Sequence, residues 1–111
     1  MEIEQQRQGA VTVLRPKGPL VADDAEEFKT HMTEAFSSSL GRFVVDASAV
    51  PFVDSRGLEV LVESAGDLWQ SGRSLKLCGV GQTLRQVLDL TGLDSLFEFY
   101  EDVNAGSRSF L

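Results

Sequence analysis

Residues Phe43–Val62, FVVDASAVPFVDSRGLEVLV, combine an apolar run, a connector and the start of a helix, and this combination indicates the type of fold. Residues 43–45 are apolar and rich in β-branched side chains, which is typical of a strand covered on both faces, and Asp46 ends the run. After the connector 47–53, apolar residues recur at helical spacing. These residues are Leu58, Leu61, Val62, Ala65, Leu68 and Trp69. The pattern predicts a buried strand followed by a helix with Trp69 on its buried stripe.

The junction between the connector and this helix places a hydroxyl beside unpaired backbone N–H groups. Asp54 is the natural N-cap, because its carboxylate can accept hydrogen bonds from the amides of the first turn. Ser55 is then the first helical residue, at the positive end of the helix macrodipole, so a phosphate added there would be stabilised. Gly57 has no side chain and lets another backbone or a partner surface approach. The junction therefore suits a phosphate on Ser55.

Composition limits the classes of function that are open to the chain. Its 111 residues, 42% of them hydrophobic and 24% charged, suit one domain spanning 1–111 that buries a core without disulfides or metal. The formal net charge of -7 argues against binding nucleic acid or an anionic membrane, because both require a basic face. The chain has no apolar stretch long enough to span a bilayer and no signal-peptide pattern. We therefore expect a cytoplasmic protein without direct membrane insertion.

Strands and helices alternate along the rest of the chain. Two N-terminal strands are joined by a turn at Gly9, and a helix with an acidic first turn follows them. A further strand, a third helix and an aromatic-rich strand come after the central unit, and the tail 101–111 has room for a weak helical turn. The expected strands are 2–8, 10–17, 43–46, 74–78 and 97–100, and the expected helices are 22–37, 55 to near 71, and 82 to near 91.

This order is ββαβαβαβ with a short C-terminal helix. Connections of this length permit crossovers between neighbouring strands, so most of the sheet should be parallel or mixed. We expect an α/β layered domain in which a mixed sheet of about five strands is flanked by helices.

Several motifs in this order resemble the STAS domain family, whose small single-domain members are the bacterial anti-sigma factor antagonists. The central motif is Phe52-Val53-Asp54-Ser55-Arg56-Gly57-Leu58, preceded by Val44-Val45-Asp46 and followed by Leu77-Cys78-Gly79 and Leu88-Asp89-Leu90-Thr91-Gly92-Leu93. The resemblance covers nearly the whole chain, and the Asp-Ser-x-Gly-Leu motif between strand and helix is fairly specific. It implies a STAS-like layered domain.

The resemblance also implies a switch operated by phosphorylation. In such antagonists a serine kinase, which is also the anti-sigma factor, phosphorylates the serine after the aspartate of the motif, and a phosphoserine phosphatase restores it. Carried over, that serine is Ser55: the unmodified chain would bind the kinase and release the sigma factor, and the phosphorylated chain would dissociate. A phosphate adds roughly -1.5 to -2 charges at neutral pH, enough to disrupt an interface without refolding. The chain would then be the substrate and ligand of an enzyme, with no catalytic residue, cofactor or metal of its own.

Two positions depart from the family pattern. The family commonly has a second Ser or Thr after the phosphoacceptor, where this chain has Arg56. It often has an acidic residue after the Gly-x-Leu that ends the second strand, where this chain has Val21, with Asp23 nearby but out of register. Arg56 could pair with a phosphate on Ser55, could contact a partner, or could be a solvated charge. We expect the partner-binding surface to comprise Asp54, Ser55, Arg56, Gly57 and Asp23.

Two other functions stay open at this point. One is a constitutively docked STAS subunit of a lipid-transporting ABC system or a stress-signalling complex, in which Arg56 would be an anchor. The other is a small hydrolase built on Ser55, which needs His31, the only histidine, within hydrogen-bond reach. The lone Cys78 is expected to be a small core residue, and 79–81 a turn between strand and helix.

Overall fold

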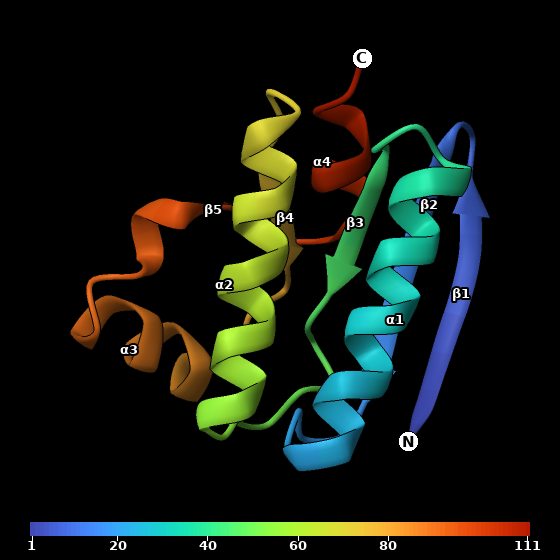
Figure 1. Cartoon of the computed structure of the whole chain (residues 1–111). Coiled ribbons are helices and arrows are strands. Elements are labelled where there is room, and N and C mark those ends of the chain that lie inside the picture. The colour runs from blue at the N-terminus through green and yellow to red at the C-terminus, as the bar shows by residue number, and fades with distance from the viewer.

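The computed structural model describes all residues, 1–111, as one five-stranded sheet with helices packed around it (Figure 1). The element order is ββαβαβαβα, with a 3-10 helix before the last strand, so the α/β order expected from the sequence is confirmed. The strands are β1 (Glu2–Gln8), β2 (Val11–Lys17), β3 (Phe43–Asp46), β4 (Leu75–Cys78) and β5 (Phe97–Tyr100). The helices are α1 (Ala22–Ser38), α2 (Ser55–Gln70), α3 (Gln82–Leu90), η1 (Asp94–Leu96) and α4 (Val103–Arg108).

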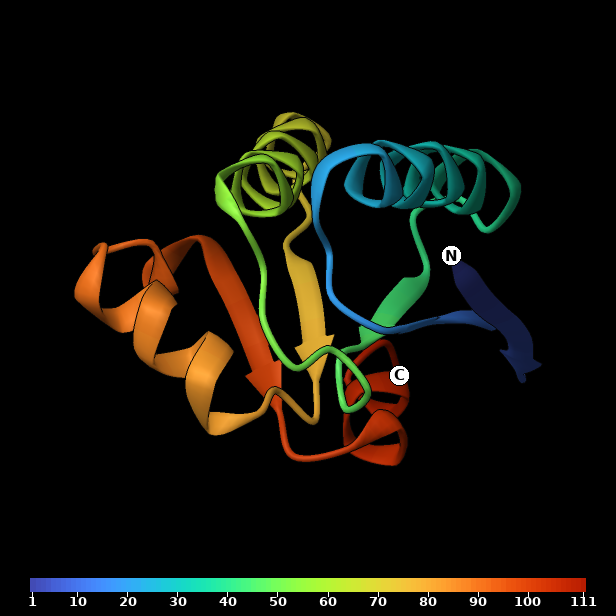
Figure 2. The ribbon, with the colours of Figure 1, turned by 90° about the horizontal axis from the view of Figure 1, so that it is seen from below.

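The strands lie in the sheet in their sequence order. β1 and β2 form an antiparallel hairpin, and β2, β3, β4 and β5 are parallel to one another. Crossovers between parallel strands are right-handed, so consecutive crossovers that advance in one direction bring their helices to the same face. α1 and α2 accordingly lie side by side on one face of the sheet, α4 covers the other face, and α3 lies at the β5 edge (Figure 2).

The core has two parts because the central strands are covered on both faces. The larger part lies between the sheet and the pair α1 and α2, and it contains fully buried side chains such as Phe28, Leu14 and Leu61. The smaller part lies on the α4 face and comprises Val11, Val13, Val44 and Cys78. The two-sided burial predicted for residues 43–45 is confirmed. Cys78 is a core residue, as expected, and its burial raises the pKa of the thiol to about 12.

The expectation that Trp69 lies on the buried stripe of α2 is wrong, because 74% of this residue is exposed. The buried face of α2 includes Gly57, Val60 and Ser64, none of which belongs to the apolar stripe expected from the sequence. At about 100° per residue, Trp69 lies nearly a third of a turn from the middle of that face. In the last turn of the helix, this displacement is enough to leave the indole in solvent.

The remaining differences are at the ends of elements, and β2 and β4 each begin one residue later than expected. α1 ends one residue later than expected, and the tail forms the six-residue helix α4, whose N-cap Asp102 accepts a hydrogen bond from Ala105 N. None of the helices has the length and apolar character needed to cross a membrane.

Candidate functional site

Ser55 lies where the chain leaves the carboxyl edge of the sheet and begins α2. It is exposed and is the first helical residue, as the sequence predicts. The loop before it runs beside the loop between β2 and α1, and Leu20 and Val53 form a parallel bridge between the two loops. Backbone hydrogen bonds join Leu20 N to Phe52 O and Asp54 N to Leu20 O, both 3.2 Å. The starts of α1 and α2 are therefore held together next to Ser55 (Figure 1).

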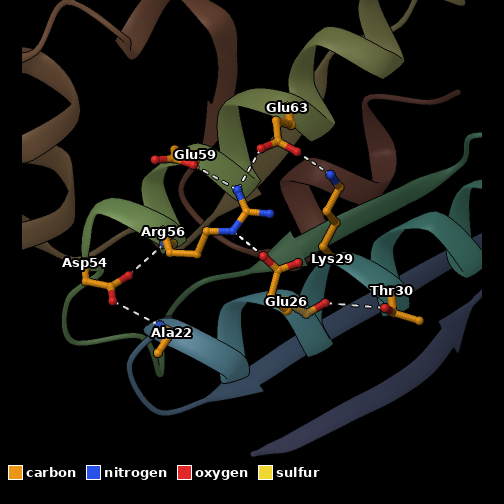
Figure 3. A network of polar contacts seen from close by, with 9 residues as sticks. Ala22, Glu26, Lys29, Thr30, Asp54, Arg56, Glu59 and Glu63 are labelled. Atoms are coloured by element: carbon orange, nitrogen blue, oxygen red, sulfur yellow. Dashed lines mark hydrogen bonds and ion pairs between the residues drawn. The ribbon is translucent and has the colours of Figure 1, made fainter.

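Asp54 caps α2 and also holds the start of α1. Its Oδ1 accepts a hydrogen bond from Gly57 N at 2.8 Å, which confirms the predicted N-cap. Its Oδ2 accepts a second one from Ala22 N at 3.0 Å (Figure 3). The hydrogen bond from Gly57 and then that from Ala22 lower the pKa of the Asp54 carboxyl below its usual range. One ionised side chain thus joins the two helix starts.

Ala22 has a backbone conformation that is unusual for a residue with a side chain. Its φ is 47°, in the left-handed region, which costs an L-residue about 1 kcal/mol or more. The hydrogen bond from its N–H to Asp54 helps to hold this conformation. The sequence carries no signal for it, because neither glycine nor asparagine marks the position.

Gly57 is required for the contact between the two loops. A Cβ on this residue would lie 2.1 Å from the carbonyl oxygen of Leu20, so no other residue fits without moving the backbone. Gly57 is buried, and the close approach predicted for it is made by the chain's own backbone. Its contribution to a partner surface would therefore be indirect, through the position of the loop beside Ser55.

Arg56 is an ion-paired bridge between α1 and α2, so the interpretation of it as a solvated charge is wrong. Its Nε donates to Glu26 of α1, and its Nη1 donates to Glu59 at 2.9 Å and to Glu63 at 2.8 Å (Figure 3). Glu63 also accepts from Lys29, and 30% of the Arg56 side chain remains exposed. Arg56 lowers the pKa of Glu26, while Lys29 and then Arg56 lower that of Glu63. The guanidinium is committed to three carboxylates.

The structure separates the other two candidate residues from this network. Asp23 is exposed in the first turn of α1, beside Ala22 but without an ion pair to Arg56. His31 lies nine residues after Ala22 along α1, which is about 13 Å at the rise of an α-helix. Because Ala22 marks the level of Asp54, His31 is out of hydrogen-bond reach of Ser55, and a triad built on these two residues has no geometric support.

Sequence reasoning missed the partners of Arg56. Glu59 and Glu63 follow it at spacings of three and seven on the same helix, so the intrahelical part could have been found from the spacing. Glu26 and Lys29 come from α1, and only the packing of α1 against α2 brings them to the site.

The chain belongs to the STAS domain family, whose model matches residues 2–106. Among curated proteins it is similar to the anti-sigma F factor antagonist of Paenibacillus polymyxa, with 26% identity over 107 residues that cover 95% of this chain and 92% of that protein.

Solved structures agree with this assignment. A candidate anti-sigma factor antagonist from Thermotoga maritima has a TM-score of 0.85 at 23% identity, covering 96% of this chain and 92% of that one. The anti-sigma factor antagonist SpoIIAA in its unphosphorylated form has a TM-score of 0.75 at 18% identity, covering 98% of this chain and 96% of that one. Bacillus SpoIIAA in its phosphorylated form has a TM-score of 0.72 at 17% identity, covering 97% and 99%. At these identities, the structural likeness establishes the fold.

Proposed function

We propose that residues 1–111 act as a single STAS domain and as an anti-sigma factor antagonist switched at Ser55. The unphosphorylated form binds an anti-sigma factor that is a serine kinase and frees the sigma factor. Phosphorylation of Ser55 ends this binding, and a phosphoserine phosphatase restores it. The observation that carries the proposal is the exposed hydroxyl of Ser55 at the start of α2, in a chain similar to an anti-sigma F factor antagonist.

The electrostatics of the site support a switch that acts through added surface charge. The N–H of Gly57 already donates to Asp54, and Nε and Nη1 of Arg56 already pair with three glutamates, so a phosphate would compete with carboxylates for both groups. A phosphoserine would add roughly -1.5 to -2 charges beside Asp54 and the exposed Asp23. A partner that fits the unphosphorylated surface would then meet additional negative charge and dissociate, with no refolding of the domain.

The modification is tested by incubating the chain with its cognate kinase and ATP and locating the phosphate by mass spectrometry. We expect the phosphate on Ser55, no incorporation into Ser55→Ala, and unchanged incorporation into Ser71→Ala, which alters an exposed serine at the other end of the same helix. Binding is then measured by titration calorimetry. Ser55→Ala should bind the kinase like the wild type, and Ser55→Glu should bind at least tenfold more weakly. Equal binding of both variants, with no phosphate on Ser55, would refute the switch.

The ion-paired state of Arg56 favours one alternative, a constitutively docked STAS subunit of a lipid-transporting ABC system or a stress-signalling complex. A fixed charge network beside Ser55 suits a permanent interface as well as a regulated one. Co-purification separates the two functions. A small kinase-like anti-sigma factor in the eluate supports the antagonist, and an ATPase subunit supports the docked subunit.

Binding and release, rather than catalysis, are the proposed activity. The partners would be the anti-sigma kinase and the phosphatase, and the exchange would take place in the bacterial cytoplasm, where the sigma factor acts. Neither nucleic acid nor a cofactor has a role in it.

A further inference from the structure

A second candidate site lies at the opposite end of β3 from Ser55. A groove of about 470 Å³ opens between the turn that joins β1 to β2 and the last residues of α4. Arg42, which directly precedes β3, forms part of its wall together with Arg108 of α4. In Figure 1 this region is at the top, where α4 and the C-terminus lie beside the start of β3.

Neither arginine of the groove has an acidic partner, although the chain has an excess of acidic residues. The ion pairs of the structure use other basic side chains, namely Arg15, Lys17, Lys29, Arg56, Lys76 and Arg85. The residues that line the groove include no Asp or Glu side chain. By contrast, the cleft near the first turn of α4 is lined by four carboxylates, those of Glu4, Asp46, Glu101 and Asp102. Leu111 at the C-terminus also lines the groove, but its carboxylate forms no ion pair with either arginine, so Arg42 and Arg108 can both meet an anion from outside.

The wall of the groove also contains a buried hydroxyl without a partner. Ser107 is only 7% exposed, and its Oγ is buried with no hydrogen-bond partner. An unsatisfied buried polar atom costs roughly 1–3 kcal/mol, and such atoms in folded proteins call for an explanation. Ser107 lines the groove next to Arg108, but its Oγ is closed off from solvent, so this hydroxyl is part of the wall and does not contact a ligand directly.

The rest of the lining is apolar, which defines the class of ligand. Val11 and Phe110 pack against the same small core cluster and border the groove. The volume is within the range of roughly 300–1,000 Å³ usual for small-molecule sites. We propose that the groove binds a small amphipathic anion, with its carboxylate or phosphate between Arg42 and Arg108 and its apolar part over Val11 and Phe110. Guanidinium groups suit both headgroups, because they donate paired hydrogen bonds to such oxygens.

The proposal is independent of the antagonist function. Arg42 precedes β3, whereas the loop to Ser55 follows it, so the two sites lie at opposite ends of the parallel strands. α4 is also on the face of the sheet that α1 and α2 do not cover (Figure 2). A ligand in the groove would leave the surface around Ser55 open.

The test is a titration of the ¹⁵N-labelled full chain with octanoate and with octyl phosphate, followed by NMR. We expect saturable shifts of the amides of Val11, Arg42 and Ser107, with little change near Ser55. Butyrate and inorganic phosphate supply the anion without the apolar part, and octyltrimethylammonium supplies the chain with the opposite charge; each should bind at least tenfold more weakly. The better of the two octyl probes identifies the preferred headgroup.

Variants test the individual contacts. Arg42→Gln combined with Arg108→Gln should weaken binding by a factor of ten or more. Arg7→Gln is the matched control: Arg7 is exposed and unpaired, but it precedes Gln8 on β1 and so points to the other face of the sheet. Circular dichroism verifies that each variant is folded.

Three results would overturn the proposal. One is equal binding of octyltrimethylammonium, which would mean that only apolar contact matters. Another is a double variant that binds as well as Arg7→Gln. The last is binding of phosphatidylglycerol vesicles without saturable shifts from either octyl probe, which would make the region a membrane contact rather than a ligand site.

Discussion

The two ends of β3 carry charge in opposite ways. At the carboxyl end, Asp54 and Arg56 are each satisfied by several partners, and the exposed Ser55 lies beside them. At the amino end, Arg42 and Arg108 have no ion pair, and the hydroxyl of Ser107 is buried without a partner. In a parallel sheet, helix starts collect at the carboxyl edge, and their N–H groups attract acidic side chains such as Asp54. The charges near the carboxyl end of β3 are therefore paired or hydrogen-bonded within the chain, whereas the amino end has two arginines without an ion pair.

Two glycines each bring two segments into contact, Gly57 at the start of α2 and Gly106 on the face of the sheet that α4 covers. Gly57 lets the start of α2 approach the carbonyl oxygen of Leu20, and Gly106 lets α4 approach the Sγ of Cys78 on β4. The contact at Gly57 is made by backbone, which cannot turn aside, whereas the contact at Gly106 is made by a side chain. The contact at Gly106 should therefore tolerate an added methyl group better than the contact at Gly57.

The largest effect is expected for Gly57→Ala. Its Cβ would lie 2.1 Å from Leu20 O, so the loop before α1 must move, and the free energy of unfolding should fall by about 3 kcal/mol. Urea denaturation measures this loss. Gly66→Ala, in open space on the same helix, is the control and should be neutral or stabilise by up to about 1 kcal/mol. Equal stability of the two variants would mean that the two loops are not in contact.

Gly106→Ala should have a smaller effect. Its Cβ would lie 2.5 Å from Cys78 Sγ, and α4 can move away as a unit, so we expect a loss of about 1–2 kcal/mol. Hydrogen exchange should show faster exchange in α4 and unchanged exchange at the start of α2. Faster exchange around Ser55 would show that the packing of α4 and the start of α2 are coupled, and would contradict their independence.

The fold could be predicted from the sequence to a greater extent than the site. Apolar runs such as 43–45 and the helical spacing after Ser55 depend on local chain geometry, and they gave the correct elements. Asp54 and Ser55 were found for the same reason, since capping is a local interaction. The contacts of Arg56 with Glu26 and of Asp54 with Ala22 join residues about thirty positions apart, and only the packing of α1 on α2 creates them. Trp69 was misplaced because the buried face of α2 includes Gly57 and Ser64, so its middle lies farther from Trp69 than the apolar residues alone indicate.

Acid should lower the stability of the region around Asp54 first. The pKa of Asp54 is lowered by its hydrogen bond from Gly57 N, so the stability it contributes is present above its unfolded value of about 4 and is lost as the pH falls through the folded value. Glu26 and Glu63, whose pKa values Arg56 helps to lower, act in the same direction. Urea midpoints measured from pH 6 to pH 3 should therefore fall.

The variant Asp54→Asn tests the part of this acid sensitivity that belongs to the cap. It retains an acceptor for the N–H of Gly57 but cannot titrate, so its stability should be lower at pH 6 and should depend less on pH below 5. Asp23→Asn is the control, because Asp23 is exposed in the neighbouring first turn without the hydrogen bonds that Asp54 makes. Parallel curves for the wild type and Asp54→Asn would contradict the role assigned to this carboxylate.

The smallest effect concerns Trp69, which lies in the last turn of α2 with 74% of its surface exposed. Trp69→Gln should change the free energy of unfolding by less than about 0.5 kcal/mol, as surface substitutions usually do. As the only tryptophan, it should also emit like an indole in water. α2 and α4 lie on opposite faces of the sheet, so saturating octanoate should leave this emission unchanged while it shifts the amides of the groove (Figure 2). A blue shift on adding octanoate would place the ligand on the α2 face instead, and the unpaired arginines would then have another role.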